Sequence, residues 1–267
     1  MRSMSAGSLV GAPGGDSAAV VGRLDESTHV GTIEIRRPPH NFFDGDALAR
    51  AVELSHELHE QGARALVLCS EGRNFCAGAD FTLPTGTTGR GDVYELGLQL
   101  LAQPLPIVVA MQGKTIGGGV GLALVGDFRV ASPQSTVWIN FAKLGLHHGF
   151  GLSVTLPRLV GHQAAASLLL TARVVDGKTA LRIGLCDHLV PAGRLRAEAH
   201  AFASEIAANG PLATLAIRQT LRGQLAEEAT AAMSLERAVQ QRLMATDDFR
   251  EGVAAVNEDR PPLFLGR

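Results

Sequence analysis

The chain has 267 residues, of which 46% are hydrophobic and 19% charged, and its formal net charge is −2 at pH 7. This length suffices for one large domain with a sizeable core, and the near-balanced charge argues against a nucleic-acid-binding surface. The apolar runs are too short to span a membrane, the start lacks the pattern of a secretory signal, and the 3 cysteines form no CxxC motif, so we expect a cytoplasmic protein.

Strand and helix patterns begin after a glycine-rich start. Residues 1–20 are mostly small, which predicts a flexible segment. The first strand is predicted over residues 31–37, where Ile33 and Ile35 alternate with polar side chains. The pattern then predicts, in chain order, an amphipathic helix over residues 44–61, buried strands over 64–70 and 106–113, and a pair of strands over 128–132 and 135–140.

The second half of the chain has a different pattern. From Gly161 onward the sequence is mostly helical, and Pro211 suits the first turn of a helix. Strands and helices therefore come first and helices alone follow. We expect an α/β core over residues 21–205 and a C-terminal helical region over residues 206–267.

Three consecutive glycines, Gly117–Gly119, stand after a predicted strand and at the start of an apolar helix. Glycine costs a helix about 1 kcal/mol relative to alanine, so clustered glycines indicate that something approaches the backbone closely. One explanation is tight packing of strand against helix. The other is an N–H donor for an oxyanion, because helix starts carry free N–H groups and a partial positive charge.

Residues 72–81, "GRNFCAGADF", repeat this arrangement after another predicted strand. Two such loops could supply two N–H donors to one carbonyl oxygen. A phosphate-binding P-loop is excluded for both GKT tripeptides, because Val108 and Ala172 stand where that motif requires glycine. Cys76 within the first loop is a candidate nucleophile, but no activating base is adjacent in sequence, which favours a buried small residue.

Several blocks in order give the chain a resemblance to the crotonase, or enoyl-CoA hydratase/isomerase, superfamily. They are "RPPHN", "FCAGAD", "GGG", "GDFRVAS", "KLGLHHGFGLSVTLPRLVG", "LTARVVDGKTALRIGLCDHLVP" and "FREGVAAVNEDRPPLFLGR". The resemblance implies an α/β fold, a spiral of ββα units with a C-terminal helical trimerisation region. It also implies an acyl-CoA substrate, as in fatty acid metabolism, with CoA as part of the substrate and no separate cofactor, and a homotrimer or a hexamer made of two trimers.

The resemblance also implies a set of site residues. The N–H groups of Ala79 and Gly118 would bind the thioester oxygen and so stabilise an enolate. The positions that match contacts to CoA are Pro39, His40, Ala77, Asp80 and Phe81. Gly117 and Gly121 would adjoin the substrate, and Trp138 and Phe141 would either line an apolar acyl pocket or belong to the core.

Two departures from the family pattern affect catalysis. Hydratases of this family use two glutamates for proton transfer, and their positions here hold Gly121 and Phe141, with Asn140 in place of the proline before the second. Neither residue can move a proton, so we expect slow hydration of simple enoyl-CoAs. The alternatives are a non-catalytic acyl-CoA-binding protein and an acyl-thioester decarboxylase or isomerase, since some related decarboxylases carry an Asn-Phe pair in this segment.

Three residues are candidates to replace the missing acid–base groups. His147 and His148 follow the Phe141 segment, and histidine exchanges protons near neutral pH. Glu95 lies where the family has a mobile active-site helix. Each has a plainer explanation, a loop imidazole bonded to backbone or a surface carboxylate, and we expect no metal site because adjacent histidines seldom bind one ion.

Overall fold

The computed structural model describes residues 9–10, 19–79 and 91–267. Within them, a seven-stranded sheet has the order β1-β2-β3-β4-β5-β7-β10. Its strands are β1 Leu9–Val10, β2 Val20–Asp25, β3 Val30–Ile35, β4 Ala65–Ser70, β5 Ile107–Met111, β7 Phe128–Ala131 and β10 His188–Leu189. The pairs from β3 through β10 are parallel, whereas β1 and β2 are antiparallel to their neighbours.

A smaller sheet has three strands and the order β6-β8-β9 in the described residues. These are β6 Lys114–Ile116, β8 Thr136–Trp138 and β9 Val174–Asp176. The helices are α1 Gly45–Glu60, α2 Val93–Ala102, α3 Gly118–Leu124, α4 Leu152–Val160, α5 His162–Thr171, α6 Gly177–Arg182, α7 Leu195–Ala207, α8 Pro211–Met244 and α9 Asp247–Asn257, with short 3-10 helices η1 Phe141–Leu144 and η2 Ala192–Arg194.

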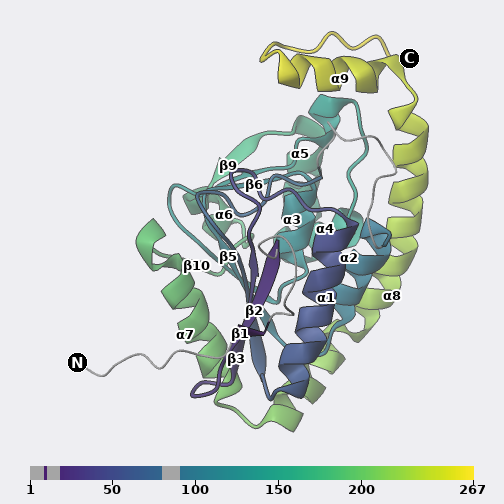
Figure 1. The fold of residues 1–267 in the computed structure, drawn as a ribbon. Coiled ribbons are helices and arrows are strands. Elements are labelled where there is room, and N and C mark those ends of the chain that lie inside the picture. Colours follow the sequence, from purple (N-terminus) through teal and green to yellow (C-terminus); the bar gives the residue numbers. More distant parts are fainter. Residues whose placement is uncertain (1–8, 11–18, 80–90) are drawn as a thin grey trace.

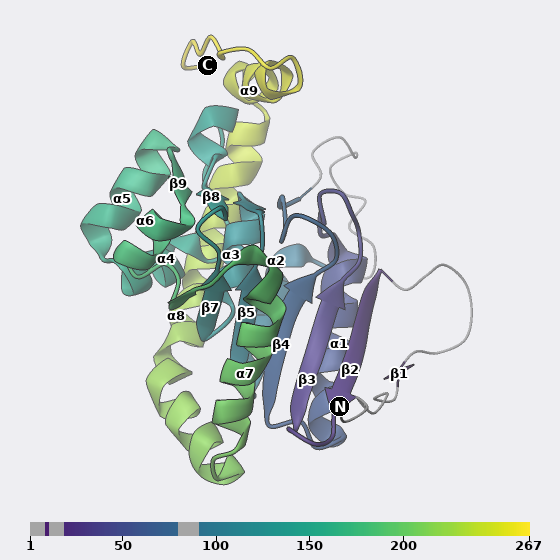
Figure 2. The ribbon, with the colours of Figure 1, turned by 90° about the vertical axis from the view of Figure 1, so that its left-hand side faces the viewer.

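Helices cover both faces of the large sheet. Figures 1 and 2 show α7 on one face and α1, α2 and α8 on the other. All six residues of β4 are buried, as expected of a parallel strand covered on both sides. Because side chains alternate along a strand, Val67 packs with the α7 cluster while Leu66 and Leu68 join the larger core on the α1 side.

The described structure confirms an α/β core followed by helices and corrects three details. Helices alone do not follow Gly161, because β9 and β10 also lie after it. The predicted pairing of residues 128–132 with 135–140 is wrong, because β7 belongs to the large sheet and β8 to the small one. The Ser132–Ser135 turn makes this switch, and the Ser135 hydroxyl donates to the Met111 carbonyl at 2.7 Å. Strands also begin earlier than predicted: β1 lies within residues 1–20, and β2 starts at Val20.

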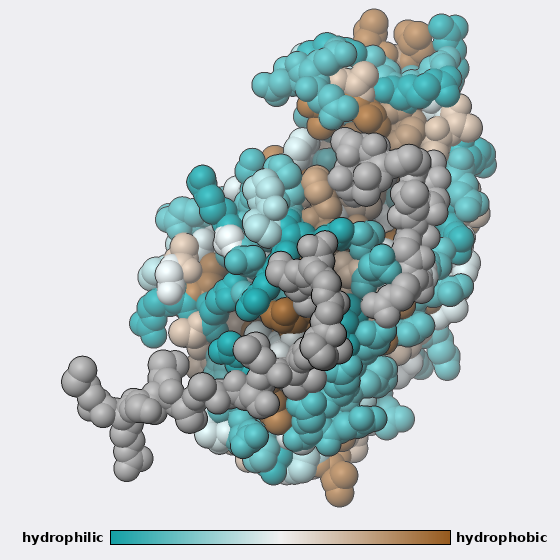
Figure 3. All heavy atoms as spheres, in the orientation of Figure 1, coloured by the Kyte–Doolittle hydropathy of each residue, from teal (hydrophilic) through white to brown (hydrophobic). Residues whose placement is uncertain are grey.

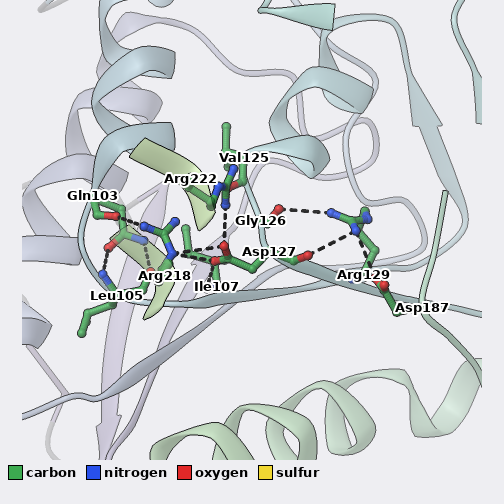
Figure 4. A network of polar contacts seen from close by, with 10 residues as sticks. All are labelled: Gln103, Leu105, Ile107, Val125, Gly126, Asp127, Arg129, Asp187, Arg218 and Arg222. Carbon is green, nitrogen blue, oxygen red and sulfur yellow. Dashed lines mark hydrogen bonds and ion pairs between the residues drawn. The ribbon is translucent and has the colours of Figure 1, made fainter. Parts of the chain in front are cut away.

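The C-terminal helix α8 is joined to the amino-terminal ends of β5 and β7 by buried ion pairs (Figure 4). Asp127 accepts from Arg218 Nε at 2.9 Å, from Arg222 Nη1 at 2.7 Å and from the Ile107 N–H at 2.8 Å. Burial lowers the pKa of Arg218, and the carboxylate of Asp127 opposes that effect. This contact lies at the sheet edge opposite the loops that form the candidate site, so its role is to hold the helical region in place.

Candidate active site

Three loops meet at the carboxyl-terminal edge of the large sheet. They are residues 36–44 after β3, 71–79 after β4 and 112–117 around β6, which follows β5. Parallel strands bring the loops after their carboxyl ends to one edge, where α/β proteins commonly bind ligands. The first two loops contain the segments that sequence analysis assigned to CoA and oxyanion binding, and the third leads into the glycine run.

A buried asparagine joins the first loop to the second. Asn41 is 0% exposed, and its Nδ2 donates to the carbonyls of Glu71 and Asn74, both at 2.8 Å. The Ala77 N–H donates to the His40 carbonyl at 2.9 Å. Sequence reasoning missed Asn41, whose positive φ of 51° is a conformation that asparagine tolerates better than most residues.

The Ala79 N–H is directed away from the first loop, which lies beside it. The Phe43 N–H donates to the Gly78 carbonyl at 3.0 Å. That carbonyl and the Ala79 N–H belong to one peptide group, and in a trans peptide the two point in opposite directions. The Ala79 N–H therefore faces away from Phe43, and within the described residues it donates to no backbone carbonyl.

The Gly118 N–H is directed out of the start of α3. Gly117 precedes the helix with φ 53°, its N–H donates to the Trp138 carbonyl at 2.8 Å, and its carbonyl accepts from the Val120 N–H at 3.0 Å. Because the Gly117 carbonyl points along the helix, the Gly118 N–H points the other way, as N–H groups of a first turn do. This is the position that the glycine run predicted for an oxyanion donor.

Glycines allow the two loops to touch. A Cβ at Gly78 would lie 3.1 Å from the Gly118 nitrogen, and Gly78 has a φ of 90°. A Cβ at Gly119 would lie only 2.3 Å from the Cys76 carbonyl oxygen, so this glycine serves close packing. Close packing therefore explains Gly119, whereas the role of Gly118 as an oxyanion donor stays a prediction.

The two residues with the proposed donors are less buried than the glycines around them. Ala79 and Gly118 are half-buried, whereas Gly78, Gly117 and Gly119 are buried. Two backbone N–H groups on adjoining loops are the kind of donor that suits a carbonyl oxygen gaining negative charge. Such donors are preorganised because they belong to the backbone.

The space next to Gly121 is filled by an aromatic side chain. A Cβ at Gly121 would lie 2.6 Å from the Cβ of Phe150, and a Cβ at Gly97 would lie 2.7 Å from its Cζ. Phe150 is 5% exposed, and its ring centroid lies 5.2 Å from that of Phe43. The position that the family resemblance assigns to the first glutamate is thus closed by packing against Phe150. Sequence reasoning missed Phe150.

The second glutamate position is also apolar. Phe141 is 6% exposed, and its Cζ lies 3.9 Å from where a Cβ of Gly117 would be. Asn140 Oδ1 lies 2.9 Å from the same point, so this amide adjoins the glycine run. Trp138 is half-buried and donates its indole N–H to the Ala172 carbonyl at 2.8 Å. Phe141 and Asn140 are therefore neighbours of the turn at Gly117–Gly118, the proposed oxyanion turn.

The candidate acid–base residues have their own partners. His148 Nε2 lies 2.8 Å from Ser153 Oγ, and burial, followed by the nearby His147, lowers the pKa of His148 to about 4. His147 Nδ1 lies 2.6 Å from the His148 carbonyl, and Glu95 is exposed in the first turn of α2. In the part of the chain that the structure describes, none of the three is hydrogen-bonded to Ala79 or Gly118. Their catalytic role stays a prediction.

Residues of α8 and α2 hold the loop that carries Phe150. Glu236 is 0% exposed and accepts the N–H groups of Gly151 and Ser153, both at 2.8 Å. Gln240 accepts from the Tyr94 hydroxyl and donates to the His147 carbonyl at 2.8 Å. Burial raises the pKa of Tyr94, so the phenol stays protonated. Sequence reasoning missed these contacts, which join residues far apart in the chain.

The remaining predicted residues are placed as follows. Pro39 and His40 are exposed on the first loop, and Ala77 is half-buried on the second. Asp80 and Phe81 lie outside the described residues. Cys76 is fully buried, and burial raises its thiol pKa to about 12, which confirms a buried small residue.

Two kinds of feature are absent from the described residues. No group of three or more His, Cys, Asp or Glu side chains is arranged to hold a metal ion. No helix among them has the length and apolar character needed to cross a membrane.

Sequence similarity to known proteins extends along nearly the whole chain. The profile of the family described as enoyl-CoA hydratase/isomerase matches residues 25–267. A putative enoyl-CoA hydratase from Thermus thermophilus is 34% identical over 253 residues, covering 90% of this chain and 98% of that protein.

Solved structures match the fold as well. The enoyl-CoA hydratase/isomerase from Pseudoalteromonas atlantica T6c has a TM-score of 0.84 at 30% identity, covering 92% of this chain and 100% of that one. A carnitinyl-CoA hydratase from Mycobacterium avium has a TM-score of 0.85 at 25% identity, covering 94% of this chain and 100% of that one.

Proposed function

Because this chain belongs to the enoyl-CoA hydratase/isomerase family, we propose that it is an enzyme of the lyase or isomerase kind that binds an acyl-CoA thioester. The N–H groups of Ala79 and Gly118 hold the thioester oxygen and stabilise the enolate that forms from it. The observation that carries this proposal is the contact between Gly78 and Gly118, which places the two half-buried donors on adjoining loops. One donor of this kind is worth about 10²–10³ in rate.

The chemistry that this site supports best does not depend on a carboxylate. Gly121 and Phe141 occupy the two glutamate positions, and Phe150 fills the space beside the first. Positioned acid–base groups contribute about 10²–10⁴ in rate, so hydration of a simple enoyl-CoA is expected to be slow. Binding and polarisation of the thioester need only the backbone donors, and CoA enters as part of the substrate without a separate cofactor.

Decarboxylation of a carboxyacyl-CoA is a second candidate reaction, favoured by the apolar surroundings of the oxyanion turn. The bond between the α-carbon and the carboxylate breaks, CO₂ leaves, and the electron pair forms the enolate, which then takes a proton from water at carbon. Phe43, Phe141 and Phe150 lie around the turn, and Asn140 is the polar neighbour. An apolar site disfavours the carboxylate relative to neutral CO₂. Isomerisation and binding without turnover are the remaining alternatives.

A homotrimer, or a hexamer of two trimers, is the assembly we propose. Exposed apolar side chains support it, since α8 presents Leu212, Ile217, Leu221 and Leu235 to solvent. Figure 3 shows further apolar side chains at the end of the chain above α9, where Leu263 and Leu265 are exposed. Light scattering at micromolar concentration tests this, and a monomer would contradict it.

Calorimetric titration tests the ligand class. Saturated acyl-CoAs of two lengths, the matching free acids and CoA itself are titrated into the protein, and a panel of enoyl-, carboxyacyl- and acyl-CoAs is scored for turnover. We expect tighter binding of the thioesters than of the free acids. Equal or tighter binding of the free acids would refute the proposal.

A further inference from the structure

Phe150 has a backbone conformation that is rare for a bulky residue. Its φ is 61°, in the left-handed region, and it is flanked by Gly149 and Gly151. Such a conformation persists only where the surroundings determine it, and it occurs preferentially at functional sites. Here Glu236 holds the following residue by accepting the Gly151 N–H at 2.8 Å, so the loop is fixed from α8.

The ring of Phe150 fits between two helices because each offers a glycine. Gly97 belongs to α2 and Gly121 to α3, and a Cβ on either would lie within 2.7 Å of a Phe150 atom. At Gly121 the contact is with the Cβ of Phe150, which cannot move away without moving the backbone. The three residues therefore form one packing unit, in which a side chain at position 121 and the present position of Phe150 exclude each other.

This packing unit lies one helical turn from the proposed donor at Gly118. One turn of a helix advances about 5.4 Å, and residues three apart lie on the same face. A thioester oxygen bonded to the Gly118 N–H would lie about 2.9 Å from that nitrogen, which places the first carbons of the acyl group within about one helical turn of it. Phe43 contacts both places: its ring is 5.2 Å from that of Phe150, and its Cζ lies 2.9 Å from where a Cβ of Gly118 would be.

We propose that Phe150 is a specificity-determining residue of this site. Its ring closes the space beside Gly121 to water and to branches on the first carbons of the acyl group, so the ligands that fit are thioesters of unbranched acyl groups. This inference rests on the proposed function, because it requires a thioester bound at Gly118.

Calorimetry with four saturated acyl-CoAs tests the specificity. The ligands are butanoyl-, hexanoyl-, 2-methylpropanoyl- and 3-methylbutanoyl-CoA, titrated into wild type, Phe150→Ala and the milder Phe150→Leu. Phe128→Leu is the matched control, because Phe128 packs on the α7 face of the sheet, with its ring centroid 4.6 Å from that of Phe202. We expect Phe150→Ala to raise the affinity for branched relative to unbranched ligands by about tenfold, the size of one methylene in an apolar pocket.

The outcomes separate this inference from the proposed function. If the ratio of affinities for branched and unbranched acyl-CoAs in the variants stays within twofold of that in wild type, Phe150 does not set specificity and only the inference fails. If no form of the protein, wild type included, binds any thioester, the proposed function fails. If the alanine variant does not fold, Phe150→Leu still allows the affinity ratio to be measured. For Phe150→Leu we expect a smaller shift of this ratio in the same direction.

A double-mutant cycle of melting temperatures tests the packing unit without any ligand. Gly121→Ala is compared in the wild-type protein and in Phe150→Gly. Overpacking should lower the melting temperature by about 2–10 °C when Phe150 is present, and by less than about 2 °C when it is glycine. Equal losses in both backgrounds would show that the two positions are independent and would overturn the mutual exclusion.

Discussion

Replacing Gly78 by alanine would disturb the contact between the two loops that carry the proposed donors. The new Cβ would lie 3.1 Å from the Gly118 nitrogen and 3.1 Å from the Ile116 carbonyl oxygen. Both neighbours are backbone atoms, so the loops must separate to accept it. The left-handed backbone at Gly78, with φ 90°, adds about 1–2 kcal/mol of strain for an alanine.

Gly72→Ala is the matched control for this change. Gly72 lies on the same loop with φ 76°, but a Cβ there would lie 3.6 Å from the Pro38 Cβ, an ordinary contact. Both variants should lose about 1–2 kcal/mol of unfolding free energy through strain. Only Gly78→Ala should also impair the donors, which would weaken acyl-CoA binding by about threefold to tenfold for one lost hydrogen bond and slow turnover by about 10²–10³.

Denaturant unfolding measures the strain, and calorimetry with an acyl-CoA measures the binding. Affinities are compared at a temperature where both variants are folded. If Gly78→Ala and Gly72→Ala weaken binding equally, or if Gly78→Ala binds as wild type does, the contact between the loops does not position the donors and the reasoning is refuted.

Three further predictions concern rate, pH and stability. The turnover rate for crotonyl-CoA hydration, measured as loss of the enoyl absorbance, should be far below about 10 per second, which is a typical enzyme turnover. A rate of about 10² per second or more would show that another group does the work expected of the glutamates. The pKa of His148 in the folded protein is about 4, below its ordinary value of 6.5, so the unfolded state takes up the proton first as the pH falls. As the pH falls from 6.5 to 4, wild type should therefore lose up to about 1.4 kcal/mol of unfolding free energy per pH unit relative to His148→Gln. Urea-unfolding free energies that change in parallel with pH for the two proteins would contradict this. Asp127→Ala leaves Arg218 buried without its carboxylate and should lower the unfolding free energy, measured in urea, by about 3–5 kcal/mol. Asp247→Ala breaks an exposed pair with Arg250 and should lower it by less than about 1 kcal/mol. Equal losses would refute the structural role of the buried pair.

The parts of the site that sequence reasoning found depend on local patterns. Gly117–Gly119 and the loop before Ala79 each follow a strand, and this order indicates that the two loops could supply N–H donors, while the resemblance assigned them to Ala79 and Gly118. The burial of Cys76 followed from the absence of an activating base nearby. The α/β core was predictable for the same reason, since alternation and helical periodicity are properties of short segments.

The parts that sequence reasoning missed depend on contacts between distant residues. The packing of Phe150 beside Gly121 was missed because nothing near Gly121 in the sequence shows that a residue of a later loop fills that space. Glu236 binds the start of α4 from α8, and no spacing rule connects them. The pairing of β7 with β8 was predicted from the turn between them. In the structure β7 instead pairs with β5 in the large sheet, and β8 pairs with β6 in the small one.

The central claim is that two backbone N–H groups polarise the carbonyl of a bound thioester, and the infrared stretching band of that carbonyl reports it directly. Difference spectra are recorded for acyl-CoA bound to wild type and labelled with ¹³C at the thioester carbon, so that its band is separated from those of the protein. The account predicts that binding shifts this band to lower frequency, that Gly72→Ala keeps the shift and that Gly78→Ala reduces it. A bound thioester whose carbonyl band stays at its frequency in water, or lies above it, would contradict the account.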